Sequence, residues 1–294
     1  MHRVRTAVHK SGYVRAITAE GVKYLRICLD VECPHAFTYP EFAGMLAGIA
    51  SVSETDLRHH LSKRKVVRYD CQLPSQVAYV RDSVVGYDNT FEADIPYVRR
   101  LFVDGQLHAD YSGRSAVFID IEVDDSRGFP NPQTSQIISV AYAYLGDSKV
   151  RWMHVSDYLG ETAMLRELRS ELESNGVGLL VGWNVEFDSE FLRVRGGFEG
   201  FDTFDLLKPY REEVKGLESY SLDSVMRHEG LGSKRRSKRV CEMTRQELHD
   251  YNTQDVAVLV EIEKRYGFVS LQLKIAELVN LPVGMLTPVR MGDT

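Results

Sequence analysis

The sequence has no apolar run approaching the roughly 20 residues that a membrane-spanning helix needs. Its first residues, MHRVRTAVHKSGYVRAI, also lack the continuous apolar core of a signal peptide. Neither a membrane protein nor a secretory leader is therefore expected. We predict a cytoplasmic protein with no membrane partner.

Cysteine is scarce as well. Cys28, Cys33, Cys71 and Cys241 are scattered over 294 residues, unlike the dense cysteine framework of a small disulfide-stapled domain. Cys28, Cys33 and His35 have a loose spacing, and no second Cys/His pair at structural-zinc spacing follows. The sequence thus favours ordinary buried thiols in a reducing compartment over a zinc site.

Positive charge is in deficit. Lys and Arg number 36 against 42 Asp and Glu, which gives a net charge of −6 and a pI near 5.9. The overall field does not attract nucleic acid, so binding of that kind needs a local basic patch. The dense basic run GSKRRSKRV is either a solvated loop or a contact for the backbone of a single strand. Its residues are Lys234, Arg235, Arg236, Lys238 and Arg239.

With 44% hydrophobic residues, the chain can bury one large core or two ordinary ones. Residues 13–30 have the pattern of paired strands, and helices are predicted over residues 40–50 and 73–84, the second capped by Ser75. Residues 1–112 are therefore predicted to form a small α/β domain, with a boundary in the polar segment HADYSGRS.

The second half of the sequence predicts strands alternating with helices. SAVFIDIEV, QIISVAYAYL, KVRWMHV and GLLVGWN are apolar runs typical of buried strands, and ETAMLRELRSELESN is an amphipathic helix. TRQELHDYNTQDVAVLVEIEKRY has a Thr244 cap with Glu247 three residues later, which predicts a long helix. The order predicts an α/β domain with a mixed sheet over residues 113–268, then a C-terminal helix and tail over residues 269–294.

Four carboxylates follow or interrupt these elements. Asp120 and Glu122 end the first strand and share one face because side chains two apart on a strand point the same way. Asp188 lies at a strand-to-helix junction and Asp255 within the long helix. Packing such charges together is costly unless cations neutralise them, and oxygen ligands suit Mg²⁺ or Mn²⁺. A site for two such ions is predicted. Other acids near these segments are expected to solvate loops or cap helices rather than bind metal, namely Asp124, Asp125, Asp202 and Asp205.

Tyr251 precedes Asp255 by four residues, so both are expected on one face of the helix. His249, six residues before Asp255, is expected on a different face and is the weaker candidate. In two-metal hydrolysis, one ion activates water and both stabilise the charge that develops on a phosphodiester. A tyrosine hydroxyl beside such a site can orient the water.

The segments FIDIEV, GWNVEFD and YNTQD resemble the three exonuclease motifs of the DEDDy proofreading superfamily. Their surroundings resemble the family B DNA polymerases of archaea and phages, through TFEADIPYVRRLFVDGQL, FDTFDLLKPYR and YSLDSV. The resemblance covers roughly residues 72–290. Each motif alone is a weak signal, but three motifs in order on matching elements form a specific one. It implies an RNase H-like exonuclease domain.

The resemblance also implies a role for each carboxylate. Asp120 matches the aspartate that contacts both metals, and Glu122 matches the glutamate on the nucleophile-side ion. Asp188 would hold the second ion through water, and Asp255 would be a further ligand of the first ion. Tyr251 would contact the attacking water.

Three further residues of the second motif, Asn184, Phe187 and Phe191, are candidate contacts for the terminal nucleotide. Phe187 and Phe191 are either stacking platforms or core side chains. Only two residues separate Asn184 from Phe187, where family B polymerases usually have three. The placement of Asn184 and Glu186 is therefore less secure than that of Asp188.

The palm motifs of family B polymerases do not occur in the sequence, so nucleotide addition by this chain alone is not expected. The predicted reaction is metal-dependent removal of 5′-mononucleotides from the 3′ end of single-stranded or frayed DNA, including a primer 3′ end. One alternative is an RNA exonuclease with the same acidic residues. Another is a noncatalytic assembly subunit that docks a separate polymerase-domain chain through LQLKIAELVNLPVGML.

Overall fold

The computed structural model describes residues 1–233 and 238–286. The chain forms two compact units, and both are discontinuous in sequence. The first unit comprises Met1–His2, Ala7–Ala16 and Lys23–His108, and the second comprises Arg3–Thr6, Ile17–Val22 and the residues from Ala109 onward. Lys234, Arg235 and Arg236 lie outside the described residues.

The first unit contains a four-stranded sheet with the strand order β6-β7-β5-β8. Each neighbouring pair in it is antiparallel. Its strands are β5 (His35–Thr38), β6 (Ser51–Arg58), β7 (Lys65–Asp70) and β8 (Thr90–Phe91). The other strands of the first 109 residues, several of which include residues of the second unit, are β1 (His2–Val4), β2 (Thr6–Lys10), β3 (Tyr13–Thr18), β4 (Gly21–Arg26) and β9 (Leu107–Ala109). Helical segments are η1 (Pro40–Leu46), α1 (Pro74–Tyr79), η2 (Val80–Val85), η3 (Tyr87–Asn89) and α2 (Tyr97–Val103).

The helix predicted over residues 73–84 forms as α1 followed by the π-helical η2. The prediction that Ser75 caps it was wrong. Leu73 is the N-cap, and Pro74 occupies the first helical position, where a missing N–H costs nothing. The Gln76 side chain accepts hydrogen bonds from the backbone N–H groups of Gln72 and Leu73.

The cysteine prediction was also wrong in part. A disulfide joins Cys28 and Cys33, whereas Cys71 is a buried free thiol, as expected, and Cys241 is an exposed one. The two bonded cysteines are only five residues apart in sequence. Proximity of this kind depends on the local turn of the chain, which cysteine spacing alone does not reveal.

The second unit contains a five-stranded mixed sheet with the order β12-β11-β10-β13-β14. β10 pairs antiparallel with β11 and parallel with β13, and the prediction of an α/β fold with a mixed sheet is confirmed. The strands are β10 (Ala116–Val123), β11 (Ile137–Tyr144), β12 (Arg151–His154), β13 (Leu179–Gly182) and β14 (Asp202–Asp205).

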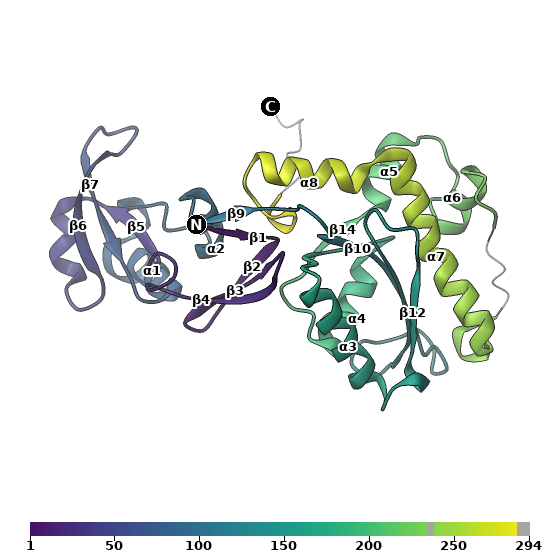
Figure 1. Ribbon diagram of the computed structural model, residues 1–294. Helices are drawn as coiled ribbons and strands as arrows, with labels where there is room; N and C mark the ends of the chain where they lie inside the picture. Colours follow the sequence, from purple (N-terminus) through teal and green to yellow (C-terminus); the bar gives the residue numbers. More distant parts are fainter. Residues whose placement is uncertain (234–237, 287–294) are drawn as a thin grey trace. The chain divides into compact units, whose positions relative to one another are not determined.

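Helices cover both faces of this sheet, with α3 and α4 on one face and α7 on the other (Figure 1). The helices are α3 (Glu161–Ser174), α4 (Glu186–Gly196), α5 (Leu207–Glu213), α6 (Leu222–His228), α7 (Arg245–Tyr266) and α8 (Phe268–Leu278), with short 3₁₀ turns η4 (Val155–Asp157), η5 (Val240–Glu242) and η6 (Val283–Met285). Thr244 and Glu247 form the capping box predicted for α7. Within the described ranges, no helix is both long and apolar enough to cross a bilayer.

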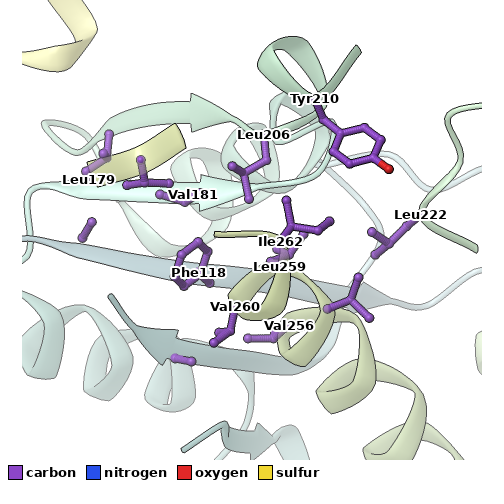
Figure 2. Close-up of a cluster of buried hydrophobic side chains, with 14 of the residues drawn as sticks. Phe118, Leu179, Val181, Leu206, Tyr210, Leu222, Val256, Leu259, Val260 and Ile262 are labelled. Atoms are coloured by element: carbon purple, nitrogen blue, oxygen red, sulfur yellow. The ribbon is translucent and has the colours of Figure 1, made fainter. Parts of the chain in front are cut away.

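Alternate side chains of β10 enter two different cores. The odd-numbered residues from Val117 to Val123 pack with α3 and α4. On the other face, Ala116 and Phe118 pack with α7 (Figure 2). The α7 side chains of that cluster are Val256, Val258, Leu259, Val260 and Ile262. Asp120 and Glu122 continue the same face, so the apolar contact between strand and helix gives way to two carboxylates.

Candidate metal and nucleic-acid site

Asp120 and Glu122 lie on β10 opposite Ala141 and Ser139 of β11. The register shifts immediately after Glu122, because Ile138 of β11 is an extra residue between the partners of Glu122 and Val123. Glu122 is 9% exposed although it is a carboxylate. Burial of an ionisable group next to another acid is unfavourable without a compensating charge, so this strand end is chemically unusual.

The long helix α7 packs across β10 and β11 and brings Asp255 to the same place. Asp120, Glu122 and Asp255 each offer a carboxylate oxygen, and these three atoms lie within 4.8 Å of one another. Asp255 is 4% exposed. The structure thus groups three of the four predicted carboxylates as potential ligands for one cation or for neighbouring cations.

The fourth carboxylate, Asp188, lies in the first turn of α4 and is also buried. Its side chain accepts a hydrogen bond from the backbone N–H of Ile121, between the two acids of β10, at 3.2 Å. Burial raises the pKa of Asp188 well above its usual value, and the neighbouring charge of Asp255 adds to this effect. A bound divalent cation would favour the ionised form of such a group.

A buried hydrogen-bonded chain holds Asp120 in position. The Asn252 side-chain NH₂ donates to the Asp120 Oδ2 at 2.7 Å and to the Asp120 carbonyl oxygen at 3.2 Å. The Ser139 hydroxyl donates to the Asn252 side-chain oxygen at 3.0 Å. Both Asn252 and Ser139 are fully buried. Sequence reasoning missed Asn252, although its place three residues before Asp255 is a polar interruption in the buried side of α7.

Tyr251 lies one turn before Asp255 on α7, as predicted. It lines a 410 Å³ pocket together with Lys238, Glu247 and Gln254. The Lys238 ammonium donates to Glu247 at 2.6 Å. Lys238 of the predicted basic run and Tyr251 thus line the same cavity, whose lining does not include Asp120, Glu122 or Asp255.

A second cavity, of 430 Å³, has Glu122 in its wall. Phe129 and Phe187 contribute to its wall and meet edge to face, with ring centroids 6.3 Å apart. Phe129 is 91% exposed, whereas Phe191 is 1% exposed and packs behind Phe187 at 4.8 Å. Phe191 is therefore a core side chain that supports Phe187. Sequence reasoning missed Phe129 because it lies in a loop with no periodic pattern.

Comparison with known proteins gives a result at the level of fold. No family model matches the chain, and no curated protein matches it. Among solved structures, the family B DNA polymerase of the hyperthermophilic archaeon Pyrobaculum calidifontis matches with a TM-score of 0.63, a sequence identity of 16% and coverage of 95% of this chain. The chain has the fold of part of a family B DNA polymerase. It spans 47% of that polymerase chain.

The turn that carries the shortened second motif has an unusual backbone. Asn184 is exposed with φ of 59°, a left-handed conformation that asparagine tolerates better than most residues. Its backbone N–H donates to Asp205 at 2.8 Å, and Leu207 N–H donates to the same oxygen. The Asp205 carboxylate therefore joins the turn after β13 to the first residue of α5.

Asp125, expected to be a solvated or capping acid, connects two segments beside the site. Its carboxylate accepts hydrogen bonds from the backbone N–H groups of Val240 and Cys241 at 3.1 and 3.0 Å. These bonds hold the pKa of Asp125 below its usual value in spite of partial burial. The chain that follows the basic run is thereby fixed to the loop that follows β10.

Proposed function

We propose that this chain is a metal-dependent 3′-5′ exonuclease of the DEDDy proofreading type, with an RNase H-like second unit. The reaction is removal of 5′-mononucleotides from single-stranded or frayed DNA 3′ ends. The observation that carries this proposal is the grouping of Asp120, Glu122 and Asp255 within 4.8 Å at one strand end. The fold shared with part of a family B DNA polymerase supports it.

The donor set fits hard divalent cations. It offers carboxylate oxygens and neither thiolate nor imidazole, and Mg²⁺ and Mn²⁺ prefer such ligands. Asp120, Glu122, Asp255 and Asp188 would hold two ions. Bound there, the ions would activate water and stabilise the charge that develops on the scissile phosphodiester.

The remaining residues bind and position. Asn252 fixes the Asp120 carboxylate through the hydrogen bond at 2.7 Å. Phe129 and Phe187 offer aromatic faces and edges beside Glu122, and stacking of a base on such rings is tolerant of sequence. Tyr251 supplies a hydroxyl for orienting water. Together these groups suit an unpaired terminal nucleotide, because a base that has left its partner can enter the cavity and stack on a ring there.

An assembly role is the alternative with a structural observation in its favour. Helix α8 leaves Leu271 and Leu278 exposed to 59% and 84%. A face of this kind is suited to covering by a further polypeptide, such as a separate polymerase-domain chain. Copurification of such a chain would support assembly without arguing against catalysis.

The test is degradation of a 5′-labelled single-stranded DNA in Mg²⁺, Mn²⁺ or EDTA, with a matched RNA strand in parallel. We expect a ladder of shortened products that requires metal and disappears in Asp120→Ala. Asp124→Ala is the matched control, since the Asp124 carboxylate accepts hydrogen bonds from Ser126 in its own turn. Its activity is expected to equal that of the wild type.

The ratio of DNA to RNA degradation decides between the deoxyribonuclease and the RNA exonuclease. Intact DNA and RNA in every metal would contradict an enzyme that acts alone. Equal loss of activity in Asp124→Ala and Asp120→Ala would point to general disturbance of the loop rather than to loss of a ligand.

A further inference from the structure

A second strongly charged feature lies in the first unit, at the turn between β6 and β7 (Figure 1). We call residues Arg58–Lys65, with the sequence RHHLSKRK, the basic hairpin tip. Two backbone hydrogen bonds close the turn, from His59 N–H to Arg64 O and from Lys63 N–H to His59 O, both at 2.9 Å. Lys63 has φ of 58°, a conformation that non-glycine residues rarely adopt.

The tip concentrates positive charge in a chain whose net charge is −6. Its residues include Arg58, Lys63, Arg64 and Lys65 and no acid. Arg58 and Lys65 lie directly opposite each other across the two strands. Like charges in that position destabilise a hairpin, so the pairing of Arg58 with Lys65 does not serve the stability of the hairpin.

Neighbouring acids neutralise only part of this charge. Arg64 pairs with Glu41, and Lys65 pairs with Glu54 at 3.1 Å. The Arg58 guanidinium donates to the Lys63 carbonyl oxygen at 3.0 Å. Across the described residues, no carboxylate forms an ion pair with Arg58 or Lys63, and both side chains are exposed.

Ring contacts fix the base of the tip to the sheet. His59 stacks on Phe91 of β8, with ring centroids 4.3 Å apart and an interplanar angle of 22°. The Arg64 guanidinium lies 3.8 Å from the centroid of the Tyr39 ring. Beyond this base, His60 is exposed and Leu61 is 81% exposed. The cations are thus presented on a preorganised turn rather than on a free loop, which lowers the entropy cost of binding.

We propose that the basic hairpin tip binds the phosphodiester backbone of a nucleic acid strand. Arg58 and Lys63 supply charge for phosphates, and His60 and Leu61 at the apex supply a ring and an apolar surface for bases and sugars. This interaction goes beyond the proposed exonuclease function. It gives the chain a second attachment to a strand, and a second attachment raises the effective concentration of the first.

The test compares two double variants that remove the same charge. Arg58→Gln with Lys63→Asn removes the two cations without acidic partners, and asparagine tolerates the left-handed backbone at position 63. Lys10→Gln with Lys274→Gln is the control, because both lysines are exposed and lie on other elements. Binding of a fluorescein-labelled oligothymidylate is measured by anisotropy in EDTA, which prevents hydrolysis, over a range of salt concentrations.

We expect the tip variant to bind about 5- to 20-fold more weakly at low salt. The slope of log affinity against log salt should fall by about 1.4, because each phosphate that a cation neutralises on a single strand adds about 0.7 to that slope. The control is expected to retain the wild-type slope. Equal affinity and slope in the tip variant and the wild type would overturn the proposal. So would an equal weakening in the control, which would indicate a nonspecific effect of net charge.

The binding result is independent of the exonuclease result. Tip-dependent binding without degradation in any metal would leave this proposal standing while the exonuclease failed. If the wild-type chain degrades DNA but the tip variant binds normally, the exonuclease proposal stands and the hairpin-tip proposal fails. A double-stranded probe in the same assay shows whether the tip prefers a single strand.

Discussion

At the scale of single residues, Asn252 is the side chain whose effect on the candidate site is best defined. Its NH₂ group donates to Asp120 twice, and its oxygen accepts the Ser139 hydroxyl. One Asp120 oxygen is thereby engaged, and the orientation of the carboxylate is fixed. Groups that orient a metal ligand in this way typically contribute about 10- to 100-fold to affinity or activity.

We therefore expect Asn252→Ala to lower the exonuclease rate about 10- to 100-fold and to raise the Mn²⁺ concentration needed for half-maximal activity. The measurement is a metal titration of DNA degradation beside a thermal melt. Thr253→Ala is the control, because the Thr253 hydroxyl donates within α7, to His249 O and Asp250 O. If Asn252→Ala lowers the melting temperature but leaves the metal requirement unchanged, Asn252 contributes to stability and does not orient the metal ligand.

The carboxylates could be predicted from the sequence because strand and helix periodicity determine which side chains share a face. Asp120 and Glu122 are two residues apart on a strand and therefore share a face. Asp255 lies on a helix whose N-cap, Thr244, can be predicted from the sequence. Asn252 was within reach of the same reasoning. Phe129 was not, because the loop conformation that brings it to Phe187 has no period.

At the scale of elements, Asp202 joins three segments of the second unit. Its carboxylate on β14 accepts hydrogen bonds from the Thr6 hydroxyl at 3.1 Å and from the Gly284 backbone N–H of η6 at 2.9 Å. Burial raises the pKa of Asp202 to about 6 from the ordinary value of 3.8. The sequence predicted only a solvating or capping acid, because the hydrogen bonds that join residues 6, 202 and 284 are set by tertiary packing.

The raised pKa gives a pH prediction with a definite sign. Between about pH 4 and pH 6 the folded state holds a proton on Asp202 that the unfolded chain has released, so this group lowers stability as the pH rises through that window. Asp202→Asn is expected to remove that component in denaturation curves measured at both pH values. Asp82→Asn is the control, because Arg81 lowers the pKa of Asp82 and the contribution of Asp82 therefore changes mainly below about pH 4, outside this window. Parallel pH profiles of wild type and Asp202→Asn would contradict the assignment.

At the scale of the whole molecule, the two compact units do not follow the order of the sequence. Arg3–Thr6 and Ile17–Val22 belong to the second unit, although a boundary near residue 112 was the sequence-based expectation. Arg5 is 2% exposed and forms an ion pair with Asp110 at 3.1 Å. Composition can predict a linker between units. It cannot predict which unit a short N-terminal strand joins, because such a strand has the same sequence pattern in either unit.

This arrangement predicts that residues 113–286 alone are less stable than the full chain. The proposed reason is the packing of Arg5 against Gly178. A substitution of Gly178 tests it, because a Cβ added there would lie 2.3 Å from the Arg5 Cβ. We expect Gly178→Ala to destabilise the full chain by about 1–3 kcal/mol, the usual cost of overpacking. In the fragment, which lacks Arg5, the same substitution should cost much less, and thermal or urea unfolding measures both.

Gly44→Ala is the matched control, since nothing lies within 4 Å of the Cβ it would add. A fragment as stable as the full chain would mean that Arg3–Thr6 contributes nothing to the second unit. An equal effect of Gly178→Ala in fragment and full chain would trace the cost to the backbone at the start of β13 rather than to Arg5. If the fragment does not fold, the full-chain effect of Gly178→Ala still decides whether Arg5 is packed as described, because Arg5→Gly in the same chain should relieve it.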